Sequence, residues 1–206
     1  MKKIICMLLA LLLMAGCLFA FASCDKDNPK DDEKEEQEDD KKQDKEDEKD
    51  NEKEDEKEDE IVIPEGYVAF SDGKITFAYP KSWTKTEGSI TMIQAMNGNN
   101  ITVASGAKDD SWATMTADVY TEAMTEEMAA QGITLSDVTV EQLTTENGEK
   151  VTKIVQTAKT ATVPAGMLQT LFIINAGELD YVITVTEATA AEGLVDAVFG
   201  SLKSVK

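Results

Sequence analysis

Hydrophobic and polar residues follow a different pattern in each of three successive stretches of the chain. Residues 4–22 are apolar almost without interruption, residues 25–60 offer nothing that could join a core, and residues 61–206 mix both kinds in short periods. The pattern predicts a hydrophobic leader over residues 1–23, a charged linker over residues 24–60 and a globular domain over residues 61–206. At 146 residues, the last stretch is long enough for a single domain with its own core.

Period-two alternation predicts a series of strands in this domain. Ile75, Phe77 and Tyr79 point to one face, with Thr76 and Ala78 on the other. Turn residues between neighbouring apolar runs predict three hairpins, which join residues 89–96 to 100–105, 138–145 to 150–158 and 167–175 to 179–186. The run Leu171–Ile174 is apolar on both faces, which predicts a central strand that is covered on both sides.

Two segments with a longer period predict helices. Residues 112–131 form the first, with Thr116 as N-cap, Gly132 as the stop, and an apolar stripe of Met115, Val119, Ala123 and Met128 beside Tyr120 and Met124. Thr189–Glu192 fits a capping box that opens a last helix, whose inward residues are Leu194, Val195, Val198 and Phe199. The order of elements predicts an α+β domain, a mostly antiparallel β-sheet flanked by helices.

Several of these segments resemble a known family. Ile75–Trp83 (ITFAYPKSW) is similar to the opening of PsbP-like domains, where a strand runs into Tyr-Pro and a Trp three residues on. Tyr181–Thr186 resembles the penultimate strand of that family, and Val198–Lys203 resembles its closing helix. The resemblance implies a PsbP-like layered sandwich over about residues 66–203, with DcrB-type bacterial lipoproteins among the relatives. It implies partner binding as a common theme, and no catalytic motif.

The leader predicts export and a lipid anchor. Lys2 and Lys3 precede the apolar run, as in a secretory signal peptide. The run is also long enough to span a membrane as an uncleaved helix, in which case its cysteines would be inert. Two segments resemble a bacterial lipobox, one ending at Cys17 and one at Cys24. We expect lipid on Cys24, because cleavage there places the charged linker directly after the lipid, whereas cleavage before Cys17 leaves four apolar residues unburied. The domain would then lie on the extracytoplasmic side of the cell membrane, held by two or more acyl chains.

The linker, Asp25–Glu60, carries 22 acidic residues and 9 Lys, a net charge of −13. Lysines recur every four residues from Lys41 to Lys57, which would form i,i+3 pairs on a helix, but no apolar face supports one. Both a disordered coil and a single charged helix fit the pattern. In either form we expect a spacer that holds the domain clear of the membrane.

Composition excludes several kinds of chemistry. The chain has no His and no Arg, and its three Cys lie at positions 6, 17 and 24, so the domain has no disulfide, no thiol nucleophile and no His- or Cys-ligated metal. The domain carries 18 acidic residues against 9 Lys, which argues against binding to nucleic acid and against direct adsorption to anionic lipid. No catalytic, cofactor-binding or metal-binding residue is assigned from sequence.

A few residues remain candidates for chemistry. Asp109 and Asp110 beside Trp112 fit either part of a cation site or a solvated loop with the Trp packed on the sheet. Tyr79, Trp83 and Tyr120 fit either a pocket or core packing, with Trp83 as a lid over one end of the core. The hydroxyls of Ser82, Ser105 and Ser111 lack a His base.

These observations favour a lipid-anchored extracytoplasmic module that binds or assembles with a protein or small ligand. The alternative is an enzyme, or a cation-dependent ligand-binding protein, that uses carboxylates alone. Carboxylate pairs for glycoside hydrolysis need no sequence motif, so the residues leave that alternative open.

Overall fold

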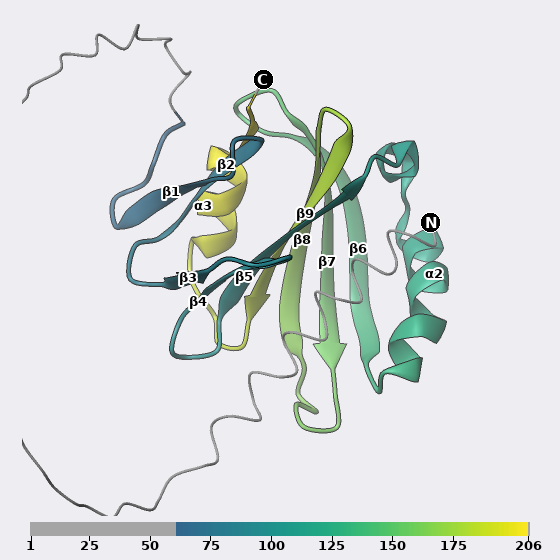
Figure 1. Cartoon of the computed structure of the whole chain (residues 1–206). Helices are drawn as coiled ribbons and strands as arrows, with labels where there is room; N and C mark the ends of the chain where they lie inside the picture. Colours follow the sequence, from purple (N-terminus) through teal and green to yellow (C-terminus); the bar gives the residue numbers. More distant parts are fainter. Residues whose placement is uncertain (1–60, 206) are drawn as a thin grey trace, which may run out of the picture.

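The structure, a computed structural model, describes residues 61–205. They form two antiparallel sheets, two α-helices and one 3-10 helix (Figure 1). The seven-stranded sheet has the order β3-β4-β5-β9-β8-β7-β6, and the three-stranded sheet the order β1-β2-β10. The elements are β1 (Tyr67–Ser71), β2 (Ile75–Pro80), β3 (Thr84–Thr86), β4 (Thr91–Gln94), β5 (Asn100–Ala107), η2 (Asp110–Thr114), α2 (Ala117–Ala130), β6 (Thr134–Thr144), β7 (Lys150–Lys159), β8 (Met167–Ala176), β9 (Leu179–Glu187), α3 (Leu194–Ser201) and β10 (Lys203–Ser204).

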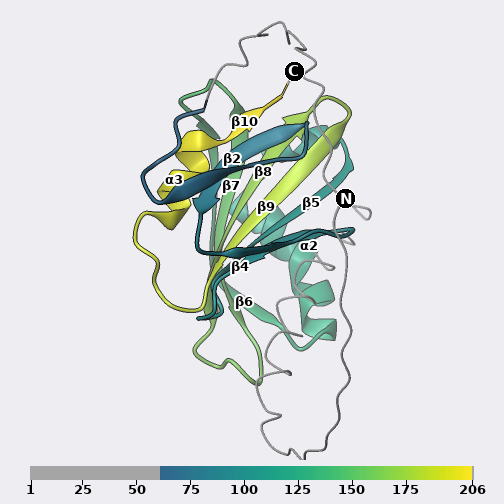
Figure 2. The same ribbon diagram turned by 60° about the vertical axis from the view of Figure 1, so that its left-hand side comes forward.

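Apolar residues on both faces of the large sheet explain the layers. On β8, Phe172 and Ile174 belong to one core cluster, while Leu171 and Ile173 belong to another on the opposite face. The first cluster lies under the small sheet and α3, and the second lies under η2 and α2. Figure 2 shows β1, β2, β10 and α3 together on one side of the long strands. The domain is therefore an α+β sandwich in which the large sheet is the middle layer.

Helix α3 also completes the small sheet. β10 pairs with β2 only at Ile75 and Thr76, so the N–H of Ala78 has no strand partner on that side. It donates to the Ser201 Oγ at 2.7 Å instead. Ala78 is fully buried, although alternation placed it on the face opposite to Phe77, because the end of α3 closes over this edge of β2.

The predicted hairpins are confirmed. β4 pairs with β5, β6 with β7 and β8 with β9, all antiparallel. Leu171–Ile174 lies in β8, hydrogen-bonded to a neighbour on each side and buried throughout, as its apolar run predicted. Three short elements, β3, η2 and β10, were not predicted, because two to five residues carry too little periodicity to mark them.

The predicted first helix was wrong in its start and in its buried face. Thr116 is the N-cap, with its hydroxyl accepting from the Val119 N–H at 3.4 Å, so the α-helix begins at Ala117 and Trp112 lies in η2. The buried residues are Tyr120, Met124 and Met128, at four-residue spacing. Val119 belonged to the predicted stripe, yet it is 46% exposed. The residue next to a buried helical position points about 100° away from it, so placing Val119 in the stripe misplaced the face.

The predicted capping box before α3 was also wrong. The N-cap is Gly193, with φ of 75° and no side-chain hydrogen bond, and the helix begins at Leu194. Thr189 serves another purpose: its backbone N–H donates to the Oδ1 of Asn99 at 3.0 Å, and its carbonyl accepts from Asn99 Nδ2 at 2.9 Å. The buried Asn99 thus ties the β4–β5 loop to the segment before α3, and that long-range contact took Thr189 away from a local cap.

Burial on α2 gives a direct test of its orientation. We expect Met124→Ala to lower the free energy of unfolding by about 2–5 kcal/mol, because it empties a fully buried site. Val119→Ala on the same helix should cost much less, since nearly half of that residue is already in water. Urea denaturation of the two full-length variants measures both values, and equal losses would show that the helix presents another face.

Candidate functional site

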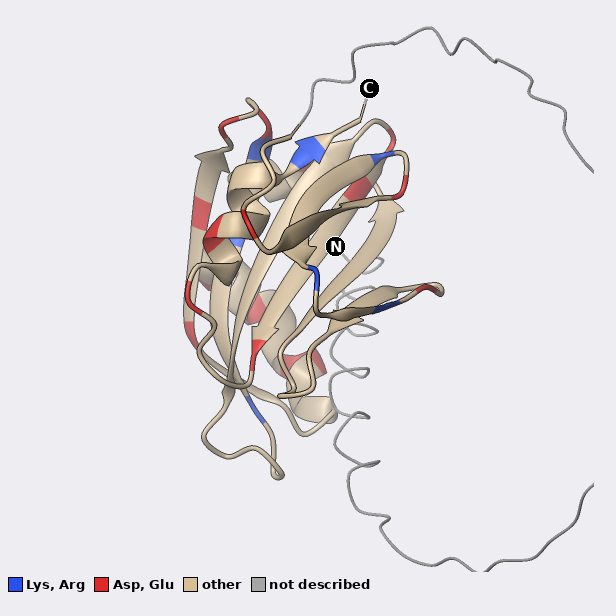
Figure 3. Cartoon of the chain, turned by 90° about the vertical axis from the view of Figure 1, so that its left-hand side faces the viewer, with Lys and Arg blue, Asp and Glu red and all other residues tan. Residues whose placement is uncertain are grey.

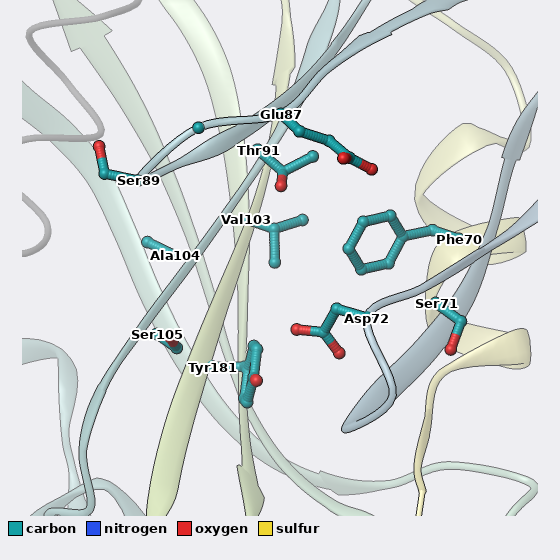
Figure 4. Close-up of a pocket in the computed structure, with 11 residues that line it drawn as sticks. Phe70, Ser71, Asp72, Glu87, Ser89, Thr91, Val103, Ala104, Ser105 and Tyr181 are labelled. Carbon is teal, nitrogen blue, oxygen red and sulfur yellow. The ribbon is translucent and has the colours of Figure 1, made fainter.

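A cleft of about 370 Å³ opens where the turn of the small sheet meets the large sheet. Four segments of the chain build it: the β1–β2 turn, the loop between β3 and β4, strand β5 and its neighbour β9. Figure 4 shows the side chains of Asp72 and Glu87 directed into the space from different walls. The lining residues are Phe70, Ser71, Asp72, Glu87, Gly88, Ser89, Thr91, Val103, Ala104, Ser105 and Tyr181.

The β1–β2 turn fixes the position of Asp72. Its Oδ1 accepts from the backbone N–H groups of Lys74 at 2.9 Å and Ile75 at 3.0 Å. This arrangement is an Asx turn, in which the carboxylate replaces a backbone acceptor. Gly73 sits inside it with φ of 80°, a conformation that a residue with a Cβ adopts only at a cost. One carboxylate oxygen is thus held by the turn, while the side chain as a whole faces the cleft (Figure 4).

The segment that follows β3 supplies the second carboxylate. Lys85 is opposite Ile93 in the β3–β4 pair, so both side chains point toward the core cluster beneath. The Lys85 Nζ lies 2.7 Å from Glu87 Oε1 and 5.9 Å from the centre of the Phe70 ring. The hydrogen bond and the charge of Lys85 lower the pKa of Glu87. Glu87 is therefore an anion at neutral pH.

Tyr181 closes the inner end of the cleft. It lies opposite Ser105 in the β5–β9 pair and is 5% exposed. Burial, together with a hydrogen bond and repulsion from Asp72, raises the pKa of Tyr181 to about 12. The phenol is therefore protonated at neutral pH and donates its hydrogen to the carboxylate.

The cleft therefore offers hydrogen-bond acceptors and negative charge on an aromatic floor. Besides the two carboxylates, its lining carries the hydroxyls of Ser71, Ser89, Thr91, Ser105 and Tyr181. The shifted groups, Glu87 and Tyr181, titrate further from neutrality than usual. Efficient general acids and bases titrate near the operating pH, so these two groups suit recognition better than proton transfer.

Asp109 and Asp110, a possible cation site in the sequence, have structural roles. The Oδ1 of Asp109 accepts from the Ser111 N–H at 2.9 Å, which caps η2, and hydrogen bonding to Ser111 lowers the pKa of Asp109. Asp110 pairs with Lys108 at 3.2 Å. Trp112 is buried in the cluster beneath α2, so the interpretation that it packs on the sheet is confirmed. Within residues 61–205, no three acidic side chains gather as metal ligands would.

The three aromatic candidates for a pocket are separated by the large sheet. Tyr79 and Trp83 pack at the edge of the cluster under the small sheet, whereas Tyr120 lies in the cluster under α2. A pocket formed by all three is therefore ruled out. Trp83 is only partly buried, so it covers the edge of the core rather than closing it as a lid.

The candidate hydroxyl residues are likewise dispersed. Only Ser105 lines the cleft, while Ser82 lies exposed after β2 and Ser111 lies in η2. Sequence analysis singled out neither Asp72 nor Glu87 as a site residue. The two residues flank β2 and β3, and no motif links them.

The predicted lipid-attachment residues, Cys24 and the alternative Cys17, lie outside the described residues, as do the leader and the linker. Among residues 61–205, neither helix is long and apolar enough to cross a membrane. Figure 3, a ribbon coloured by residue type, shows acidic positions in several loops and in α3, with lysine positions scattered among them. The cleft is therefore one part of a generally acidic surface rather than the centre of a single charged patch.

Comparison with solved structures finds similar folds. The chain resembles the solution structure of cyanobacterial PsbP (CyanoP) from Synechocystis sp. PCC 6803, with a TM-score of 0.49 and 13% identity over 68% of this chain and 92% of that one. It also resembles a crystal structure from Bacteroides thetaiotaomicron VPI-5482, with a TM-score of 0.33 and 16% identity over 67% of this chain and 48% of that one. No protein-family model and no curated protein matches the sequence. The likeness concerns the fold alone.

The raised pKa of Tyr181 predicts a loss of stability in alkali. Its folded pKa of about 12 exceeds the ordinary value of 10.0, so its contribution is complete below pH 10 and is lost as the pH rises toward 12. We expect the free energy of unfolding to fall less steeply over this range in Tyr181→Phe than in the parent. Urea denaturation at several pH values measures the slopes. Identical slopes would mean that the phenol titrates alike in the folded and unfolded chains.

Proposed function

We propose that the protein is a lipid-anchored extracytoplasmic binding module whose ligand contacts are made in the cleft between the β1–β2 turn and the β3–β4 loop. The observation that carries the proposal is that Asp72 and Glu87 point into one hollow (Figure 4), whose lining also includes five residues with hydroxyl groups and comes from four segments of the chain. Concave sites with a few converging polar groups over apolar residues are the usual form of ligand sites. Phe70 and Val103 supply the apolar part here.

Binding suits this cleft better than catalysis does. One oxygen of Asp72 is occupied by two backbone N–H groups, and Glu87 is paired with Lys85. Carboxylates used for acid–base or nucleophilic work need free lone pairs and a pKa matched to the reaction. Held in these contacts, both carboxylates are better suited to hydrogen-bonding a ligand. We therefore favour a non-enzymatic role over a carboxylate-dependent enzyme.

The anchor follows from sequence. Cys24 directly precedes a linker with a charge of −13, and the domain surface is acidic as well. Anionic lipid headgroups repel both, so attachment to the membrane requires covalent acyl chains. The linker would place the cleft away from the headgroups, where an extracytoplasmic ligand can reach it.

The anchor residue can be identified directly. We expect mass spectrometry of the mature protein to find a lipidated N-terminal peptide that begins at Cys24. Cys24→Ser should abolish the lipid, whereas Cys17→Ser should leave it in place. A lipidated peptide that begins at Cys17 would contradict the assignment.

Photo-crosslinking tests the cleft as the contact surface. We expect a benzoylphenylalanine at Ser89, an exposed residue of the cleft, to form a discrete adduct in native membranes upon irradiation. The same group at Thr125, exposed on α2, is the matched control and should form none. Adducts at both positions, or at neither, would argue against the cleft.

A further inference from the structure

We propose that the cleft binds a small ligand through a primary ammonium group, held between the Phe70 ring and the carboxylates of Glu87 and Asp72. The inference rests on the proposed binding function and adds the chemical class of the ligand. The protein itself places one ammonium group, that of Lys85, at the edge of this cleft.

The side chain of Lys85 shows the contacts that such a group can make. Its Nζ is 5.9 Å from the centre of the Phe70 ring and 2.7 Å from a carboxylate oxygen of Glu87. A cation over an aromatic face is attracted by the electron-rich ring, and an ammonium beside a carboxylate forms a charge-assisted hydrogen bond. Phe70 and Glu87 both line the cleft, but Lys85 itself is not among the lining residues. The Phe70 ring also stacks on Phe77, with 4.8 Å between ring centres, so a ligand ammonium would reach Phe70 and Glu87 by taking the place of Lys85.

The remaining lining suits the donors of an ammonium. An ammonium has three N–H donors and no acceptor, so it needs a surface rich in acceptors. Asp72 provides carboxylate oxygens across the cleft from Glu87 (Figure 4). The Tyr181 hydroxyl is already hydrogen-bonded to Asp72 and Ser105, so the two carboxylates are the main acceptors. The hydroxyl of Thr91 adds a further acceptor (Figure 4).

The charge of the lining and the number of its oxygen ligands argue against anions and calcium ions. The lining holds two carboxylates and no Lys, which disfavours anions. A calcium ion takes six to eight oxygen ligands, mostly from carboxylates and carbonyls, and no cluster of metal ligands exists within residues 61–205. The volume, about 370 Å³, is at the small end of ligand pockets, which run from about 300 to 1,000 Å³. A small amine meets all these limits.

Lys85 would compete with the ligand for Glu87. The Lys85 and Glu87 side chains are 35% and 71% exposed, and exposed ion pairs of this kind contribute little to stability. A ligand ammonium can therefore displace Lys85 at small cost. Removing the lysine charge should strengthen ligand binding, while removing the Glu87 charge should weaken it.

Calorimetric titration of the mature full-length protein in detergent tests the inference, with 1,4-diaminobutane as probe and 1,4-butanediol as its neutral counterpart. At physiological salt we expect saturable binding of the diamine alone. Glu87→Gln should weaken it by at least about tenfold, which is the loss of one charge-assisted hydrogen bond. Lys85→Met, which keeps the length of the stem, should tighten it.

Matched controls separate the cleft from the overall negative charge. Lys153 and Glu141 form an ion pair at 3.9 Å on β7 and β6, at the opposite edge of the large sheet from β3. Glu141→Gln and Lys153→Met make the same charge changes there and should leave binding unaltered. If they shift affinity as much as the cleft variants do, the diamine is attracted by diffuse charge and the inference fails.

Two further outcomes would overturn the ammonium assignment. Equal binding of the diol would show that the cleft takes a ligand without regard to charge, and the absence of saturable heat with either probe would show that it takes no small amine. In both cases the crosslink at Ser89 still reports whether the cleft is a contact surface. Failure of the ligand class is thus distinguishable from failure of the proposed function.

Discussion

Strands β8 and β9 carry buried side chains on both faces, and the rest of the domain is arranged to keep water away from both. Phe172 and Ile183 face one cluster, and Leu171 and Val182 face the other. Each such side chain contributes about 1.5–3 kcal/mol when fully buried. With no Cys beyond position 24, no disulfide supports the domain. Its stability therefore depends on having a covering layer on each face.

The two coverings differ in kind, and the cleft follows from that difference. One face is covered by η2 and α2, the other by a small sheet and α3 that lie side by side. The small sheet meets the large sheet near β5 and β9 through the β1–β2 turn. A narrow turn covers less of the large sheet than a strand or a helix does. Side chains there, such as Ser105, remain exposed while Tyr181 nearby is buried. The junction of a turn with a sheet thus leaves polar groups around a hollow.

Sequence predicted what local patterns determine and missed what distant contacts determine. Hairpins and the buried run Leu171–Ile174 follow from turn residues and alternation, so they were predicted correctly. The helix face containing Val119 was wrong because a short stripe of mixed residues fits more than one orientation, and packing decides between them. Thr189 failed as a cap because Asn99, 90 residues earlier, bonds to it. The cleft could not be predicted, since Asp72, Glu87 and Tyr181 meet only through the tertiary fold.

The acidic linker and the acidic cleft would act on a cationic ligand over different distances. At physiological ionic strength the field of a charge decays over about 8 Å, so the linker attracts any cation nearby but cannot select one. Selection requires contacts that water and salt do not screen, and the buried Phe70 ring beside Glu87 offers such a contact. Added salt should therefore weaken the general attraction more than the contacts within the cleft. On this proposal, the ligand affinity measured at high salt comes from the contacts within the cleft. The additional affinity measured at low salt comes from attraction by the linker.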